Sequence, residues 1–198
     1  MKVVGLCGGS GSGKGLVCSF FSDLGVKCID TDTVYHDMIS TDSECTKELI
    51  SYFGQEISAS SGIDRTKLRE VVFASKENLK ALNEITHKHI LEEVRLCISE
   101  TKSAGEAIGI VIDAPLLFES RFDEECDLTV AVVSDTDRRI ERIIARDTIT
   151  REDAIRRISK QIPDDLLITR CDYVLENNSD ANELRKKVYD LAKTLFNN

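Results

Sequence analysis

Proline, low-complexity tracts and long apolar runs are scarce or absent in this chain of 198 residues. With only two prolines and no compositionally biased segment, the sequence shows no linker between domains. No repeat of fixed period suggests a solenoid, and no apolar run is long enough to cross a bilayer. The N-terminus lacks a basic region followed by an apolar stretch and a cleavage site. With 41% hydrophobic residues, we expect one soluble cytoplasmic unit spanning 1–198 and holding one substantial core.

Net positive charge and closely spaced cysteines are also missing. The 26 Lys and Arg residues are outnumbered by 35 Asp and Glu residues, which gives a formal net charge of -9. This balance argues against a general nucleic-acid binder, so any phosphate-binding surface must be local. The seven cysteines include no CxxC pair. An odd number of scattered cysteines favours reduced structural thiols in a cytosolic protein over a disulfide framework.

A glycine-rich segment follows the first predicted strand. Residues 8–14 read GGSGSGK and fit the pattern GxxxxGK, which cradles the phosphates of a nucleoside triphosphate. The apolar run 2–7 before it predicts a buried strand, and apolar residues at helical spacing after it predict a helix. Glycines let successive N–H groups converge on phosphate oxygens at the helix N-terminus, where Lys14 neutralises the outer phosphates. This strand-to-helix context is much less consistent with a merely flexible Gly/Ser loop.

The residue after this lysine departs from the pattern. Ser or Thr normally places a hydroxyl on magnesium there, whereas this chain has Gly15. Magnesium keeps several waters when it binds a nucleotide, so we expect water to replace the hydroxyl, held by Asp32 or Asp113. Contacts to ATP are expected from Gly9, Gly11, Ser12, Gly13, Lys14, Gly15 and Leu16.

Runs of β type alternate with helical patterns along the chain. They lie at about 2–7, 26–30, 107–113, 127–133 and 172–176. This alternation predicts an α/β protein with a five-stranded parallel sheet flanked by helices. The interval 37–105 carries mostly helical patterns and predicts an inserted helical subdomain beside the carboxyl ends of the strands, where such sheets bind ligands.

Aspartates follow two of the predicted strands. Asp30 and Asp32 come after the second strand, and Asp113 ends the third. A carboxylate at this edge can accept a proton from an attacking hydroxyl or hold magnesium through water. The alternative is a helix cap or turn residue, as Pro115 suggests for Asp113. We favour a functional role for Asp32 and leave the two readings of Asp30 open.

Between positions 138 and 160, basic residues outnumber acidic ones by eight to four. Arg139, Arg142 and Arg146 share one helical face, opposite a row of isoleucines, and can clamp a transferring phosphoryl group. Thr150 and Asp153 resemble a capping box that starts the next helix. The segment at about 146–165 is therefore predicted to be a mobile lid that excludes water. An ordinary solvated face with salt bridges is the alternative for Arg138 and Arg151.

The histidines give weaker signals. His87 and His89 point about 200° apart on a helix and do not form a chelate, so packing or hydrogen bonding is favoured. His36 lies one turn beyond Asp32 and either contacts substrate or is an ordinary surface histidine.

An ordered set of short motifs runs through nearly the whole chain. It comprises 8–14, Leu24-Gly25, Ile29-Asp30-Thr31-Asp32, Ile63-Asp64-Arg65 with Leu68 and Val72-Phe73, Leu82-Asn83 with His87, Pro115-Leu116-Leu117-Phe118-Glu119, Arg146-Asp147, Arg157 with Gln161, and Asp172-Tyr173-Val174 with Asn177. In these motifs the chain resembles the dephospho-CoA kinases, P-loop kinases that phosphorylate the ribose 3′-hydroxyl of dephospho-CoA. Departures from the family pattern are Gly15, Lys88 where proline is usual, and Cys171 where alanine is usual.

The resemblance implies a P-loop kinase fold that uses ATP, dephospho-CoA and Mg²⁺. It implies that Asp32 is the general base or orienter of the 3′-hydroxyl, that Lys14 binds ATP phosphates, and that Arg142 or Arg146 contacts ATP from the lid. Asn177 is expected near the adenine pocket, and 37–105 is expected to accommodate dephospho-CoA. Substrate contacts are expected from Asp32, His36, His87, Asp113 and Leu117.

Two other functions are compatible with parts of the sequence. A small-molecule kinase of the nucleoside monophosphate type would share the phosphate loop and differ in its acceptor. A nucleotide-binding regulatory module without turnover is suggested only by Gly15, and Asp32 and the arginine-rich segment argue against it. The identity of the phosphate acceptor distinguishes the first alternative from a dephospho-CoA kinase, and the presence of turnover distinguishes the second.

Overall fold

The computed structural model describes residues 1–196, and the chain divides into two compact units. One unit holds Met1–Ile29 together with the chain from Glu100 onward, and the other holds Asp30–Ser99. The organisation as a single kinase domain with an insertion at 37–105 and a lid at about 146–165 stays a prediction.

A five-stranded parallel sheet forms the centre of the first unit. Its strands are β1 (Val3–Cys7), β2 (Val26–Asp30), β3 (Gly109–Asp113), β4 (Leu128–Val133) and β5 (Tyr173–Glu176). They lie in the order β2-β3-β1-β4-β5, with β1 paired in parallel to both β3 and β4. The predicted fold class is confirmed, and the largest difference in a strand's start is at β3, which is expected from 107 and begins at Gly109.

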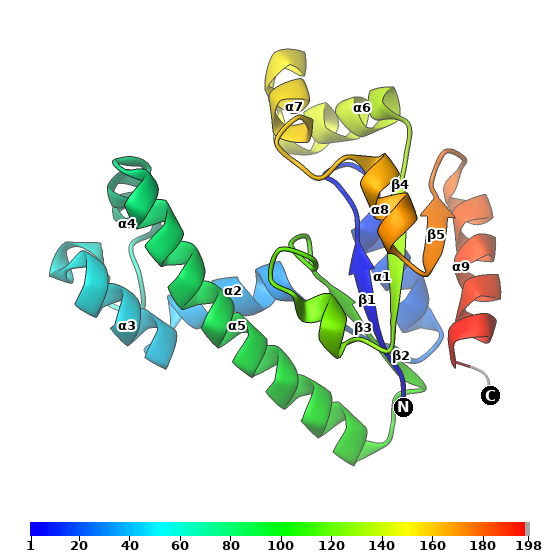
Figure 1. The fold of residues 1–198 in the computed structure, drawn as a ribbon, viewed down its shortest axis with the longest axis horizontal. Coiled ribbons are helices and arrows are strands. Elements are labelled where there is room, and N and C mark those ends of the chain that lie inside the picture. The colour runs from blue at the N-terminus through cyan, green and yellow to red at the C-terminus, as the bar shows by residue number, and fades with distance from the viewer. Residues whose placement is uncertain (197–198) are drawn as a thin grey trace. The chain divides into compact units, whose positions relative to one another are not determined.

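Helices cover this sheet because its central strands have apolar side chains on both faces. Every residue of β1 and β3 is buried. Leu6 of β1 packs in one core with Phe21 of α1 (Lys14–Asp23) and Leu184 of α9 (Ala181–Phe196). In Figure 1, α9 runs beside β5 at the end of the sheet. The loop between β1 and α1 is therefore held at both ends by core elements.

The remaining helices of this unit follow β4. They are α6 (Thr136–Asp147), α7 (Arg151–Ile158) and α8 (Asp164–Arg170), and a short 3-10 helix, η2 (Phe122–Glu125), precedes β4. Ile140 and Ile143 of α6 pack with Ala154 of α7 in a small core of their own, and the two helices are neighbours in Figure 1. The predicted helix start at Thr150 is confirmed, because the Thr150 side chain accepts a hydrogen bond from the Asp153 N–H and caps α7.

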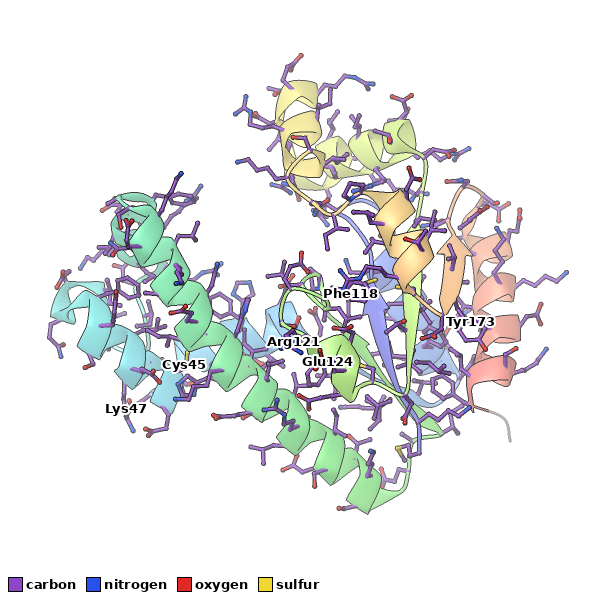
Figure 2. The ribbon with its side chains drawn as sticks, in the orientation of Figure 1. Cys45, Lys47, Phe118, Arg121, Glu124 and Tyr173 are labelled. Carbon is purple, nitrogen blue, oxygen red and sulfur yellow. The ribbon has the colours of Figure 1, made fainter. Side chains whose placement is uncertain are left out.

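The second unit is helical. It contains α2 (Thr31–Ser40), α3 (Glu44–Phe53), the 3-10 helix η1 (Gln55–Ile57), α4 (Arg65–Phe73) and most of α5 (Lys76–Ala104). Their apolar faces meet in a core built by Ile39, Cys45, Leu49, Phe53, Ile57, Ile63, Leu68, Val72, Ala81 and Ile85. Figure 2 labels Cys45 in this core and Lys47, which pairs with Glu44 on the same helix.

The helical part begins at Thr31, earlier than the predicted position 37. The reason is local, since the Asp30 carboxylate accepts a hydrogen bond from the Asp32 N–H and caps α2. Within residues 1–196, no helix is long and apolar enough to span a membrane. All seven cysteines are free thiols.

Candidate active site

The glycine-rich loop lies between β1 and α1, as the pattern predicts. Gly11 and Gly13 have φ angles of 77° and 101°, in the left-handed region that side chains with a Cβ rarely adopt. Gly13 is the N-cap of α1, so the loop ends at the N-terminus of a helix, where backbone N–H groups attract an anion. The backbone is thus shaped for phosphate by its own residues.

Lys14 and Asp113 come together beside this loop. The Lys14 ammonium donates a hydrogen bond to the Gly8 carbonyl at 3.1 Å and lies 3.8 Å from Asp113 Oδ1. Asp113 is only 9% exposed at the carboxyl end of β3, next to β1 in the sheet. The third-strand aspartate is therefore placed at the phosphate loop, and the Lys14 charge balances its carboxylate.

Arg142 and Asn177 hold the loop from outside. The Asn177 side-chain amide donates to the Ser12 carbonyl at 2.7 Å, and Arg142 Nη1 donates to the Gly11 carbonyl at 3.1 Å. Arg142 Nη2 also donates to the Asn177 carbonyl at 3.1 Å, which connects the two residues. A peptide unit is planar, so fixing the Ser12 carbonyl also fixes the direction of the Gly13 N–H. Burial lowers the pKa of the Arg142 guanidinium, which still stays charged at neutral pH.

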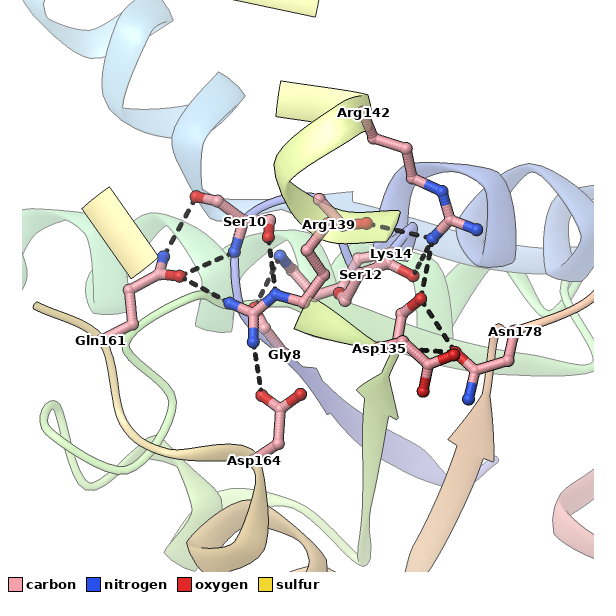
Figure 3. A network of polar contacts seen from close by, with 12 residues as sticks. Gly8, Ser10, Ser12, Lys14, Asp135, Arg139, Arg142, Gln161, Asp164 and Asn178 are labelled. Carbon is pink, nitrogen blue, oxygen red and sulfur yellow. Dashed lines mark hydrogen bonds and ion pairs between the residues drawn. The ribbon is translucent and has the colours of Figure 1, made fainter. Parts of the chain in front are cut away.

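Ser134 and Asn178 extend this support, and sequence reasoning missed both. The Ser134 hydroxyl donates to the Asn177 carbonyl at 2.8 Å and accepts from Arg142 Nη1 at 3.2 Å. The Asn178 side chain accepts from the Asp135 N–H at 2.8 Å. Figure 3 shows the contact between Asp135 and Asn178. Their positions could have indicated a role at the loop, because each follows the carboxyl end of a strand. Ser134 follows β4, which lies beside β1, and Asn178 comes shortly after β5, which lies beside β4.

The three arginines predicted on one polar face of α6 have different surroundings. Arg139 is 3% exposed, as buried as the neighbouring Ile140, and only Arg146 is well exposed. Arg146 binds the adjacent Asp147, and Arg157 of α7 binds the same carboxylate. These two guanidinium groups lower the pKa of Asp147 from 3.8 to about 2. The face is thus partly a structural network rather than a uniform row of phosphate ligands.

Asp30 and Asp32 differ in their local contacts. Asp30 is the cap of α2 and accepts hydrogen bonds from the Asp32 N–H and from the Thr33 hydroxyl at 2.9 and 3.0 Å. The capping alternative thus holds for Asp30. Asp32 is exposed in the first turn of α2, directly after β2, and His36 is exposed one turn later on the same helix face.

Of the two histidines of α5, His89 has the hydrogen-bonding role that the sequence favoured. His89 Nε2 lies 2.7 Å from a carboxylate oxygen of Glu48, in a hydrogen-bonding role. His87 is half-buried on the same helix. Among residues 1–196, no group of three or more His, Cys, Asp or Glu side chains is arranged to hold a metal ion by itself.

A pocket of about 100 Å³ borders the first residues of the phosphate loop. It is lined by Cys7, Gly8, Gly9, Pro115, Leu116, Phe118, Glu119, Lys160, Gln161, Ile162 and Leu167. Leu117 is fully buried and packs under Gly5 of β1, so its two neighbours line the pocket in its place. The Arg170 guanidinium carbon lies 3.9 Å from the centre of the Phe118 ring, which Figure 2 labels.

Comparison with known proteins gives a consistent family. Residues 2–183 match the family model described as dephospho-CoA kinase. A dephospho-CoA kinase from Fusobacterium nucleatum is 39% identical over 98% of this chain and 99% of its own length. A Thermus thermophilus crystal structure has a TM-score of 0.78 at 27% identity, covering 98% of this chain and 97% of that one. The structure titled dephospho-CoA kinase from Campylobacter jejuni shares the fold, with a TM-score of 0.73 at 22% identity, covering 98% and 96% of the two chains.

Proposed function

This chain belongs to the dephospho-CoA kinase family, and we propose which of its residues carry out the reaction of that family. The activity is ATP-dependent phosphorylation of dephospho-CoA, the final step of coenzyme A biosynthesis. The observation that carries the assignment is the full-length similarity, which includes the helical unit Asp30–Ser99 as well as the loop. Neither a nucleoside monophosphate kinase nor a module without turnover is supported by these matches.

We propose that the phosphate loop binds the triphosphate of ATP. The glycine geometry, the helix N-terminus and the charge of Lys14 support this assignment. Arg142 and Asn177 are proposed to keep the loop in this shape, since both donate to its carbonyl groups. Leu16 and Arg146 are proposed as further contacts to ATP, and Asn177 is proposed to lie near the adenine base.

Asp32 is proposed as the general base. In the reaction, the 3′-oxygen of dephospho-CoA bonds to the γ-phosphorus while the bond from that phosphorus to the ADP oxygen breaks. The hydroxyl proton passes to the Asp32 carboxylate, and Lys14 and Arg142 stabilise the charge that develops on the phosphoryl oxygens. The exposed position of Asp32 directly after a strand of the sheet supports this role.

Magnesium is proposed to accompany ATP and to be held through water. A Cβ at Gly15 would have no atom within 4 Å, so space is available where the usual hydroxyl stands. Asp113 supplies a carboxylate at the loop, and Asp32 is the second proposed outer ligand. These oxygen donors fit Mg²⁺, which retains several waters in nucleotide sites. When bound, the ion neutralises charge on the β- and γ-phosphate oxygens.

His36, His87, Asp113 and Leu117 are proposed as contacts to dephospho-CoA, as the family resemblance implies. Leu117 is buried, so its proposed role is through its pocket-lining neighbours Leu116 and Phe118. We place the reaction in the cytoplasm, where ATP is present and where seven scattered cysteines stay reduced.

The test is ATP consumption with dephospho-CoA as acceptor, with magnesium titrated and nucleosides and nucleoside monophosphates as competing acceptors. We expect turnover only with dephospho-CoA and only with magnesium. Asp32→Asn should nearly abolish phosphoryl transfer and leave ATP affinity largely intact, because the amide keeps the shape of the carboxylate but accepts no proton. Undiminished turnover of this variant would remove Asp32 from the role of base.

A further inference from the structure

Arg139 is the most buried guanidinium beside the phosphate loop. Its side chain is 4% exposed, and its three nitrogens donate to three separate groups. Nε donates to the Ser10 carbonyl at 3.0 Å, Nη1 to Asp164 Oδ1 at 2.8 Å, and Nη2 to Gln161 Oε1 at 3.0 Å. Figure 3 shows the guanidinium between the loop and these two side chains.

Gln161 binds the same loop residue from the other direction. Its Oε1 accepts from the Ser10 N–H at 2.9 Å, and its Nε2 donates to the Ser10 hydroxyl at 3.0 Å. The N–H, the carbonyl and the hydroxyl of Ser10 are therefore all bound by Arg139 and Gln161. Ser10 is thus held by side chains that come from outside the loop.

The loop also packs directly on Arg139. A Cβ at Gly9 would collide with Nη2 of Arg139, and a Cβ at Gly11 would lie 2.6 Å from the Arg139 carbonyl oxygen. Glycine at these two positions therefore lets the loop backbone lie against this arginine. The path of the loop and the placement of Arg139 depend on each other.

The electrostatics separate Arg139 from the phosphate ligands. Its charge is paired with Asp164 at 2.8 Å in a nearly buried site. Each of its three nitrogens already donates to a protein group, so a shift of the guanidinium toward a phosphate would break these hydrogen bonds. Only arginine presents donors in a planar fork that reaches three acceptors at once, whereas lysine offers a single ammonium. The geometry therefore fits a role in holding the loop.

We propose that Arg139 is a positioning residue for the ATP site, fixing Ser10 and with it the phosphate loop through Gln161 and Asp164. The segment between α7 and α8, which carries Gln161, is thereby tied to the loop. This inference rests on the proposed assignment of the loop to the ATP phosphates. Its consequence is selective: loss of Arg139 disturbs binding of ATP and leaves binding of dephospho-CoA unchanged.

The experiment compares Arg139→Gln and Arg139→Lys with wild type. We expect Arg139→Gln to raise the KM for ATP about tenfold, with the KM for dephospho-CoA unchanged, because the loss of charged hydrogen bonds to Ser10 lets the loop N–H groups move away from the ATP phosphates. Arg139→Lys should give an intermediate KM for ATP, since the ammonium keeps the pairing with Asp164 but not the fork. The matched control is Arg138→Gln, one residue earlier on α6, where the side chain is half exposed and lies 3.7 Å from Asp135.

The outcomes separate the inference from the assignment on which it depends. Lys14→Met, measured in parallel, should lose ATP binding; if it does not, the loop is not the ATP site. If Lys14→Met loses ATP binding and Arg139→Gln has a KM for ATP within twofold of wild type, the positioning role is overturned. Equal rises in both KM values also overturn it, because they indicate general loosening. If Arg139→Gln fails to fold, the same comparison of the KM for ATP with the KM for dephospho-CoA is made with Arg139→Lys.

Discussion

Replacing Gly15 with serine tests how this kinase holds magnesium. Gly15 is the second residue of α1, and a Cβ there meets no atom within 4 Å, so the loop accepts a larger residue without collision. Serine adds the hydroxyl that phosphate loops normally place on magnesium. The matched control is Gly15→Ala, which adds the Cβ without an oxygen.

The expected magnitudes differ for stability and for binding. Glycine in a helix is less favourable than alanine by about 0.8–1 kcal/mol, with serine between the two, so both variants should raise the free energy of unfolding slightly. On binding of magnesium-ATP, the added hydroxyl makes one interaction with a charged partner, which contributes about 1.5 kcal/mol. Since about 1.4 kcal/mol equals a factor of ten, Gly15→Ser should bind magnesium-ATP about tenfold more tightly than Gly15→Ala. Gly15→Ala should bind it as wild type does.

Calorimetric titration with magnesium-ATP and turnover at varied magnesium measure these effects. The magnesium concentration for half-maximal rate should fall for Gly15→Ser, with kcat equal to or above that of wild type. Denaturant unfolding of both variants separates the helix effect from the binding effect. If serine binds no more tightly than alanine, or if affinity and turnover both fall, water does not stand in the place of the missing hydroxyl and the reasoning is refuted.

Two further predictions concern pH and oxidation. Arg146 and Arg157 lower the pKa of Asp147 to about 2, below its ordinary 3.8, so the stabilisation by this carboxylate is complete above about pH 5 and is lost as pH falls through the folded-state pKa. The difference in unfolding free energy between wild type and Asp147→Asn should therefore shrink from about pH 5 to pH 2 in urea titrations, and a constant difference would contradict the pairing. The Sγ atoms of Cys7 and Cys171 lie 3.4 Å apart, and hydrogen bonding from Cys7 lowers the pKa of Cys171. Hydrogen peroxide should join them in a disulfide, because the two thiols lose two hydrogens as peroxide is reduced to water. The disulfide should slow the kinase until dithiothreitol is added. The prediction is wrong if peptide mapping finds no such cross-link, or if peroxide inhibits the Cys171→Ala variant to the same extent.

Much of the fold is readable from the sequence because it depends on residues a few positions apart. The apolar run of β1, the glycines at Gly11 and Gly13, and the helical spacing after Lys14 specify a strand, a turn and a helix without reference to the rest of the chain. The Thr150 cap of α7 is equally local. The phosphate loop, the strand end that carries Asp113 and the strand that precedes Asp32 were therefore predictable.

The supports of the loop were decided only by the tertiary structure. Helical periodicity places Arg139 with Arg142 and Arg146 on one polar face. In the fold, however, Arg139 is buried against Ser10 and Asp164, and these partners lie 129 and 25 positions away in the sequence. Asn177 reaches the Ser12 carbonyl across 165 positions. Burial and hydrogen bonding at such separations depend on which strands become neighbours, and local patterns do not contain that information. The sequence alone thus determined that the chain has a phosphate loop between a buried strand and a helix, and the packing of β4, β5 and α6 around that loop decided which side chains hold it in shape.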